Sequence, residues 1–385
     1  MTEESTPTPM LPPPPDAGAR PSGNWPERRW TRALTVVFVV GCLAGVLALI
    51  PAQAIGRIVP GHAQIDDELV AQKPGSARST ITSVAVDAAG VDEPEGAILF
   101  TTVALDTQIS VLDWIQGQWD DDIVLRRRED VLGSRTVTEN RERNLEMMRV
   151  SKDVAVIVAL NHLGIAVIEE TGVAFESVED TGPAHSVLVP GDVIIAVDGT
   201  EITGVASLLN ALSNKVPGEV GRVTVDNIDT LEIRTEELTW GINPDRPGGF
   251  IGIANVVPRQ AELPLPFEVE IDSGNIGGPS AGLAFTLTIL DLLTDGELTG
   301  GQDVAVTGTI NLGGSVGNVG GLGQKAAAAY DAGAVAFLVP TESVELAEKH
   351  ARDMPVIGVD TLWDALDALA SLGGDTQDLE LLIGV

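Results

Sequence analysis

Two glycine-rich segments hold residues whose types and settings could perform chemistry. The segment NIGGPSAG contains Ser280, and the segment GGSVGNVGGLGQK ends at Lys325. Glycines allow sharp turns, and Pro279 suits the first turn of a helix, so we expect Ser280 at a helix N-terminus. The unpaired backbone N–H groups there could stabilise a negative oxygen that develops on a carbonyl. Ser280 would then be placed as a nucleophile, although serine is also a common helix cap.

Lys325 is one of only five lysines in the chain, and four alanines follow it. A lysine in apolar surroundings is desolvated, which lowers the pKa of its amine and leaves that amine able to accept a serine proton. We therefore predict that Lys325 acts as a general base for Ser280. The competing interpretation is a lysine whose amine reaches solvent from the end of a helix.

Residues 248–385 contain the predicted strands and helices that could position these two side chains. Strand-like and helix-like runs alternate there, which predicts an α/β or α+β domain with a core of its own. Taken together, the segments GGPSAG, TGTI and GGLGQK resemble the proteolytic domain of the Lon family. This resemblance implies that Ser280 and Lys325 form a catalytic dyad that needs no cofactor and no metal. The acidic residue that usually follows Thr-Gly in the family is replaced here by Thr309, so no accessory acidic role is implied.

Residues 165–240 show short strands separated by turns, with Gly191-Asp192 and Asp198-Gly199 on either side of an apolar strand. This sequence pattern resembles a PDZ domain, in the circularly permuted arrangement found in bacterial proteases. The resemblance implies a small α+β domain that binds an extended peptide at its sheet edge. The nearest candidate for the family's carboxylate-binding loop is Leu163-Gly164-Ile165. The alternative is a domain that only separates its neighbours.

The N-terminal part of the chain is predicted to lie outside these domains. Residues 1–32 are rich in proline and are expected to form a disordered cytoplasmic tail. Residues 33–55 carry no charge and, at about the 20 residues that span a bilayer, predict a transmembrane signal-anchor helix. Arg28, Arg29 and Arg32 precede it, so everything after Ile55 is expected to be extracytoplasmic. The alternative is a cleaved signal peptide, since Ala52-Gln53-Ala54 fits a cleavage site.

Residues 56–164 are expected to form an extracytoplasmic N-terminal region without chemistry of its own. A strand-like run covers residues 97–103, a charged stretch covers 126–142, and helical periodicity covers 151–163. The predicted fold class is therefore multidomain, with a transmembrane helix, a PDZ-like α+β domain and a C-terminal Lon-type domain.

Composition excludes several classes of function. A net charge of −33, from 23 basic and 56 acidic residues, argues against nucleic acid as a partner. The single cysteine, Cys42, excludes an intramolecular disulfide and cysteine-based zinc sites. The four histidines, His62, His162, His185 and His350, fit neither a serine–histidine triad nor an H-E-x-x-H zinc motif.

The sequence thus predicts a membrane-anchored serine endopeptidase that acts on peptides or on unfolded or membrane-proximal proteins. No G-x-x-x-x-G-K-[ST] phosphate loop occurs, so hydrolysis is expected to be independent of ATP. Assembly into a homo-oligomer is left open. Three alternatives are a non-catalytic peptide-binding scaffold, a dinucleotide site at residues 321–326, which fit G-x-G-x-x-A, and a nucleotide site at GGPSAG like that of some small-molecule kinases.

Overall fold

The computed structural model describes residues 27–52, 69–88, 91, 94–243, 247–265, 267–376 and 379, with the backbone alone at 27–32. The predicted tail at 1–26, the cleavage site beyond Ala52 and the start of the predicted 56–164 region lie outside the described residues. The chain divides into two units, which are described separately. One is residues 1–67 with 108–116, and the other comprises 68–107 and 117–385.

The first unit contains helix α1 (Glu27–Leu49) and helix α3 (Val111–Gln116). None of the helices in the described part of the chain combines the length and the apolar character that crossing a membrane requires. Helix α1 begins with four charged residues among its first six and ends at Leu49, so its charge-free part is shorter than the about 20 residues of a full span. The predicted transmembrane helix over 33–55 is therefore not supported.

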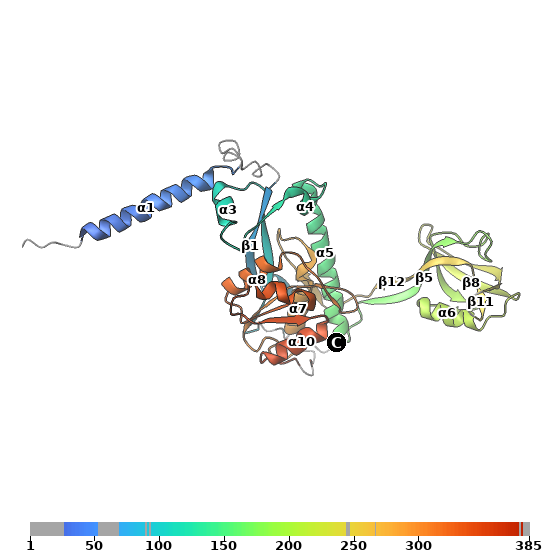
Figure 1. Cartoon of the computed structure of the whole chain (residues 1–385). Helices are drawn as coiled ribbons and strands as arrows, with labels where there is room; N and C mark the ends of the chain where they lie inside the picture. The colour runs from blue at the N-terminus through green and yellow to red at the C-terminus, as the bar shows by residue number, and fades with distance from the viewer. Residues whose placement is uncertain are drawn as a thin grey trace, which may run out of the picture. The chain divides into compact units, whose positions relative to one another are not determined.

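A six-stranded sheet with the order β18-β17-β14-β3-β1-β4 forms the centre of the second unit (Figure 1). Its strands are β1 (Leu69–Ser79), β3 (Ala97–Asp106), β4 (Val124–Arg127), β14 (Asp303–Val306), β17 (Ala336–Pro340) and β18 (Val356–Val359). The strands from β3 to β18 are parallel, whereas β1 is antiparallel to both β3 and β4. Parallel strands are usually covered on both faces, which explains their continuous apolar runs.

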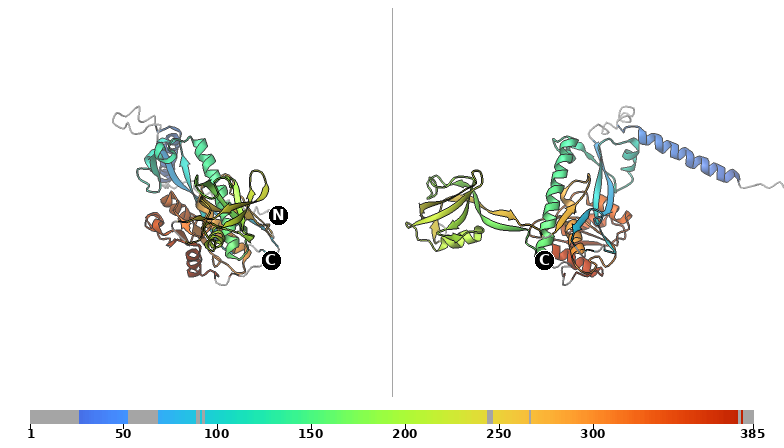
Figure 2. Two further views of the ribbon diagram at one scale, coloured as in Figure 1. Left: turned by 90° about the vertical axis from the view of Figure 1, so that its right-hand side faces the viewer. Right: turned by 180° about the vertical axis from the view of Figure 1, so that it is seen from behind.

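Helices cover both faces of this sheet. Figure 2 presents the chain from two further sides. The helices and short turns around it are α4 (Arg128–Leu132), α5 (Val137–His162), η1 (Pro279–Ala281), α7 (Gly282–Leu293), α8 (Leu322–Asp331), η2 (Thr341–Ser343), α9 (Val344–Glu348) and α10 (Leu362–Ser371). Ile98 and Phe100 of β3 pack in the core with α5, α7 and α10, whereas Leu99 packs in the core with α8 and α9. This alternation along one strand yields a three-layer α/β domain.

The N-terminal strands belong to this same domain, which differs from the predicted division at residue 164. Strand β3, which confirms the strand-like run at 97–103, pairs with β14 over Ala97–Phe100. Two further strand pairs complete the domain: β2 (Val84–Asp87) with β13 (Glu268–Ile271), and β15 (Thr309–Ile310) with β16 (Val316–Gly317). Residues 69–163 are therefore part of the domain that holds Ser280 and Lys325. The reason is that β3 has buried apolar side chains on both of its faces, so it must lie inside a sheet that is covered on both faces.

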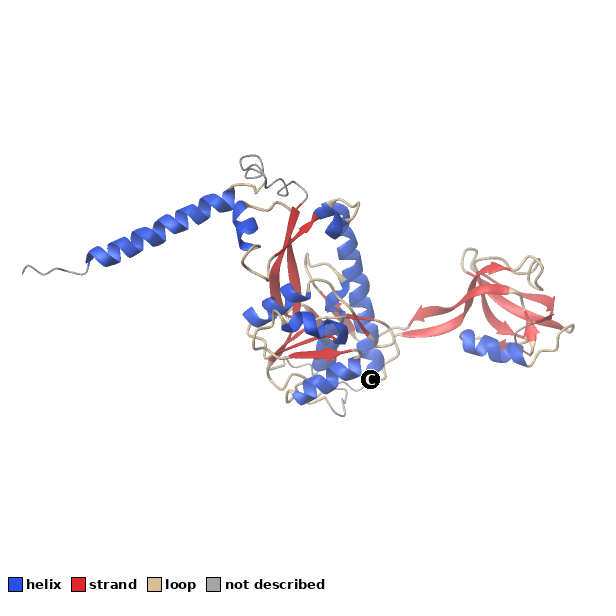
Figure 3. Cartoon of the chain, viewed as in Figure 1, coloured by secondary structure: helices blue, strands red, loops and turns tan. Residues whose placement is uncertain are grey.

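A second sheet with its own core lies between α5 and β13 in the sequence (Figure 3). Its elements are β5 (Ile168–Val178), β6 (Asp192–Val197), β7 (Thr200–Glu201), α6 (Val205–Ser213), β8 (Val220–Asn227), β9 (Glu232–Thr239) and β12 (Ile253–Glu262), with the small pair β10 (Gly241–Ile242) and β11 (Gly249–Phe250) beside it. Asp198 and Gly199 both have positive φ and form the predicted turn between β6 and β7. The domain extends to residue 262 and not to 240.

Candidate active site

Ser280 lies in the short turn η1, directly before α7, as predicted for a helix N-terminus. Gly278 has a φ of 99°, a conformation that glycine adopts without strain, and Pro279 opens the turn. Helix α5 holds this segment from outside: Ser151 Oγ donates to the Pro279 carbonyl at 3.0 Å, and the Gly278 N–H donates to the Asn144 carbonyl at 2.7 Å. The backbone around the Ser280 hydroxyl is therefore fixed by a helix that the sequence assigned to another region.

Lys325 lies in the first turn of α8 and is buried, with only 4 % of its surface exposed. Burial lowers the pKa of its amine to about 7, from the usual value of 10.5. The surrounding alanines, such as Ala326 and Ala327, supply no group that could stabilise the charged form. About half of the amine is therefore neutral at pH 7 and most of it above that pH, and the neutral form is the one a general base requires.

Thr307 links the two candidate residues and was missed as a functional residue by the sequence analysis. The Lys325 amine donates to Thr307 Oγ1 at 2.9 Å, and this hydroxyl in turn donates to the Ser280 carbonyl at 3.2 Å. The Gly308 N–H donates to the same carbonyl at 3.0 Å. A neutral amine that donates one N–H to Thr307 keeps its lone pair for another proton donor. The position of Thr307, directly after the buried strand β14, was the signal available in the sequence.

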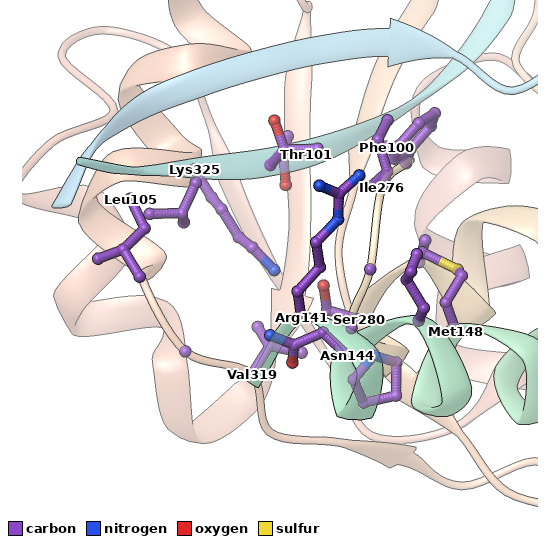
Figure 4. A pocket seen from close by; sticks show the side chains of 18 of the residues that line it. Phe100, Thr101, Leu105, Arg141, Asn144, Met148, Ile276, Ser280, Val319 and Lys325 are labelled. Atoms are coloured by element: carbon purple, nitrogen blue, oxygen red, sulfur yellow. The ribbon is translucent and has the colours of Figure 1, made fainter. Parts of the chain in front are cut away.

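Ser280 and Lys325 line one pocket of about 680 Å³, here called the Ser280 pocket. Figure 4 shows the Lys325 side chain extending toward Ser280, with Phe100, Met148 and Ile276 on the apolar part of the wall. No hydrogen bond joins the Ser280 hydroxyl to the Lys325 amine among the described residues. Such contacts are often long in ligand-free enzymes and tighten when substrate binds.

Thr309 also lines the Ser280 pocket, at the position where an acidic residue was noted as missing. None of the described lining residues is Asp or Glu, so no carboxylate of the pocket can act beside the two candidate residues. His350 lies elsewhere and contacts Asp122 at 2.6 Å, while the His162 ring contacts the Trp363 ring at a tilted angle. Within the described chain, the histidines therefore do not form a triad with Ser280.

Comparison with known proteins identifies the domain that carries this site. Residues 268–369 match the model of the Lon protease (S16) C-terminal proteolytic domain, and residues 161–233 match the PDZ domain. The chain contains a Lon-type proteolytic domain and a PDZ domain. The Lon-type domain spans both Ser280 and Lys325, and its first strands, β1 and β3, precede the matched range.

Relatives of the Lon-type domain are themselves Lon proteases. The chain is 38 % identical over 94 residues to a Lon protease of Campylobacter concisus, covering 23 % of this chain and 11 % of that protein. It is 37 % identical over 158 residues to a Lon protease of Chloroflexus aggregans, covering 40 % of this chain and 17 % of that protein. The chain thus spans less than a fifth of the length of these two relatives.

Among solved structures, the PDZ domain of an SdrC-like protein from Listeria innocua is similar to part of the chain. The similarity covers 21 % of this chain and 90 % of the Listeria chain, with 21 % sequence identity and a TM-score of 0.20.

The PDZ domain has an apolar groove between α6 and the edge strand β12. Leu208, Leu209, Ile253 and Val256 line this groove, which has a volume of about 100 Å³. Its glycine-containing segment is Phe250–Ile253, in which Gly252 has a φ of 84°. The candidate loop at residues 163–165 instead ends α5, since the Ile165 N–H donates to the Leu160 carbonyl at 2.9 Å. The sequence analysis missed the groove segment because it ended the PDZ domain at residue 240.

Proposed function

We propose that this chain is a serine endopeptidase in which Ser280 is the nucleophile and Lys325 is its general base. The observation that carries the proposal is a buried lysine, with a pKa lowered to about 7, in the same pocket as a serine at a helix N-terminus. The Lon-type domain around them supports this reading, because its relatives are named as proteases. The proposal does not require a metal or a cofactor.

In the proposed mechanism, the neutral amine of Lys325 takes the hydroxyl proton of Ser280 as the oxygen attacks the peptide carbonyl. The developing oxyanion lies near the start of η1 and α7, where backbone N–H groups and the helix dipole favour negative charge. The protonated Lys325 then donates its proton to the leaving amine, and the acyl group stays on Ser280 Oγ. Water attacks this ester with Lys325 again as the base, which releases the product and restores both residues.

Thr307 is expected to orient the Lys325 amine during these proton transfers. Replacing it with valine keeps the shape but removes the acceptor of the amine N–H, so we expect kcat to fall by about 10- to 100-fold. The charged amine also loses a hydrogen-bond partner, so the pKa that governs the rise of activity with pH should move lower. Thr307→Ser keeps the hydroxyl and should restore both the rate and the pH profile. An unchanged pH profile in Thr307→Val would contradict this role.

Independence from ATP is part of the proposal, supported by the lack of a phosphate-loop motif in the sequence. The test is to incubate the purified chain with an unstructured protein, with and without ATP and Mg²⁺, and to identify the products by mass spectrometry. We expect internal cleavage at equal rates in both conditions. The absence of any cleavage in either condition would refute the proposed activity, and cleavage only with ATP would refute its independence.

The PDZ domain is proposed to bind an extended peptide along β12, with an apolar side chain in the groove beside α6. Leu209 lines this groove and is 38 % exposed, so Leu209→Glu should leave the fold intact and weaken peptide binding by about tenfold or more. Val220→Glu, on the exposed surface of β8, is the matched control. Fluorescence anisotropy with a labelled peptide measures both, and equal affinities would contradict the groove. An amidated version of the peptide tests whether Phe250–Ile253 binds a free carboxylate.

Attachment of the chain to a membrane is a separate part of the proposal and does not depend on the catalytic site. It rests on the uncharged sequence of residues 33–55 and on the exposed apolar side chains of Leu34, Val37 and Phe38, at 67, 70 and 70 %. Fractionation of cells with an alkaline wash distinguishes attachment from release, and protease added outside the cell reports on which side the domains lie.

A further inference from the structure

The charged side chains that line the Ser280 pocket are all basic. They are Arg78 of β1, Arg141 of α5 and Lys325, and no Asp or Glu lines the pocket among the described residues. This contrasts with a chain that has 56 acidic and only 23 basic residues. Lys325 is buried, and burial favours its neutral form, so the permanent charge of the pocket comes from the two arginines.

Arg141 keeps most of its hydrogen-bonding capacity available. It extends into the pocket from α5 (Figure 4) and donates from Nη2 to the Asn275 side-chain oxygen at 3.2 Å. This contact uses one of the five N–H donors of Arg141, so four are left for a ligand. Neither Arg141 nor Arg78 forms an ion pair with a carboxylate in the described part of the chain, and Arg78 donates from Nε to Ser76 Oγ at 3.0 Å. By contrast, Arg149, near the middle of α5, is paired with both Glu146 and Asp153.

From these observations we infer that the Ser280 pocket selects peptides that carry an Asp or Glu side chain close to the bond that is cleaved. A guanidinium is always charged at physiological pH, and its planar set of donors matches the two oxygens of a carboxylate. Because no described lining residue is acidic, no carboxylate of the pocket competes for the two arginines. Arg141 contacts Asn275, in the segment that leads to the nucleophile, so it is the principal specificity residue.

The acidity of the whole chain does not oppose this selection at short range. Charges on the surface are screened beyond about 8 Å at physiological salt, whereas a carboxylate held in the pocket contacts the guanidinium directly. The net charge of −33 instead slows the approach of acidic peptides, so the preference is expected in kcat/KM values that compare peptides of equal net charge. The peptide pair in the test is therefore balanced by a compensating distant residue.

The test compares internally quenched peptides of equal net charge that have Glu or Gln at one position near the cleavage site, with the compensating residue far from it. The position is scanned over three residues on each side of the cleaved bond. At the best position we expect the wild-type chain to favour Glu by about 10- to 100-fold in kcat/KM. Arg141→Gln should remove at least nine-tenths of this ratio, because it lowers the rate on the Glu peptide far more than the rate on the Gln peptide. Arg143→Gln, which changes an exposed arginine of α5 outside the pocket, is the matched control and should leave the ratio unchanged.

Two outcomes would overturn the inference. One is a wild-type ratio close to one at every position, and the other is an equal loss on both peptides in Arg141→Gln, which would mean that Arg141 only supports Asn275. The inference rests on the proposed protease function, and the two can fail separately. If no peptide is cleaved, anisotropy with Ser280→Ala still measures whether the Glu peptide binds more tightly than the Gln peptide, and equal binding refutes the charge selection.

Discussion

Replacing Ser280 with alanine is expected to lower the rate of peptide hydrolysis by about 10⁴-fold or more, because the variant has no oxygen nucleophile. The fold should be unaffected. The carbonyl of residue 280, which accepts hydrogen bonds from Gly308 and Thr307, is retained in the variant. Hydrolysis of the unstructured protein and a thermal unfolding curve measure the two properties. Because substrate binding is preserved, the variant should also retain uncleaved substrates during purification.

The control for this variant is Ser315→Ala, which removes an exposed serine from the second glycine-rich segment. It should be fully active. If Ser280→Ala cleaved as fast as the wild-type chain, the dyad would be refuted, and a peptide-binding scaffold would be the remaining interpretation. If Ser280→Ala unfolded at a lower temperature than the wild-type chain, the loss of activity would have a structural cause. The two rates would then be compared at a temperature at which both chains are folded.

Replacing Lys325 with methionine is expected both to abolish hydrolysis and to increase the free energy of unfolding. Methionine has a similar shape but no amine that could accept the Ser280 proton, so the rate should fall by about 10³-fold or more. The wild-type lysine has a folded-state pKa of about 7 and an unfolded pKa near 10.5. At pH 7 the unfolded chain therefore binds a proton more readily, which destabilises the wild-type fold by about 4 kcal/mol, partly offset by the hydrogen bond to Thr307.

The sign of this effect fixes its dependence on pH. Between pH 7 and 10.5 the unfolded chain carries more protons at this site than the folded chain, so wild-type stability rises with pH through that window. The advantage of Lys325→Met is full below pH 7 and disappears above pH 10.5. Urea unfolding at pH 6 and pH 10 measures it. Wild-type hydrolysis should rise through pH 7 for the same reason, since only the neutral amine accepts the Ser280 proton.

Lys349→Met is the matched control, because this lysine is 61 % exposed and pairs with Glu345 one helical turn earlier. Exposed pairs of this kind contribute little, so its unfolding free energy should stay within about 0.5 kcal/mol at both pH values. Lys325→Met would contradict the assignment if it kept wild-type activity. An unfolding free energy that differed from wild type equally at pH 6 and pH 10 would show that the buried amine is not the cause.

Local sequence was sufficient to predict the immediate settings of the two candidate residues. Pro279 and the flanking glycines predicted that Ser280 begins a helix, and the alanines after Lys325 predicted that the amine is buried. The turn at Asp198-Gly199 was predictable for the same reason, since positive φ restricts the residue types that a tight turn accepts.

Features that depend on distant parts of the chain could not be predicted in this way. The pairing of β3 with β14 joins Ala97 to Asp303, and no local pattern indicates such a partner. The contact of Lys325 with Thr307 and the support of Pro279 by Ser151 likewise arise only after the sheet and helices assemble. The groove segment around Gly252 was assigned to the wrong domain because glycines close to a predicted boundary favour a linker as much as a binding loop.

The insertion of the PDZ domain between α5 and β13 determines the order in which the chain can fold during synthesis. The PDZ domain is continuous, and its two ends meet where the Leu263 N–H donates to the Val167 carbonyl at 2.8 Å, so it can fold as soon as it leaves the ribosome. Strand β3, by contrast, lacks its partner β14 until about two hundred further residues have been made. The pair of β1 and β3 thus keeps an unpaired, apolar edge on β3 until β14 has been made, and we expect a chaperone or a misfolding event to act there.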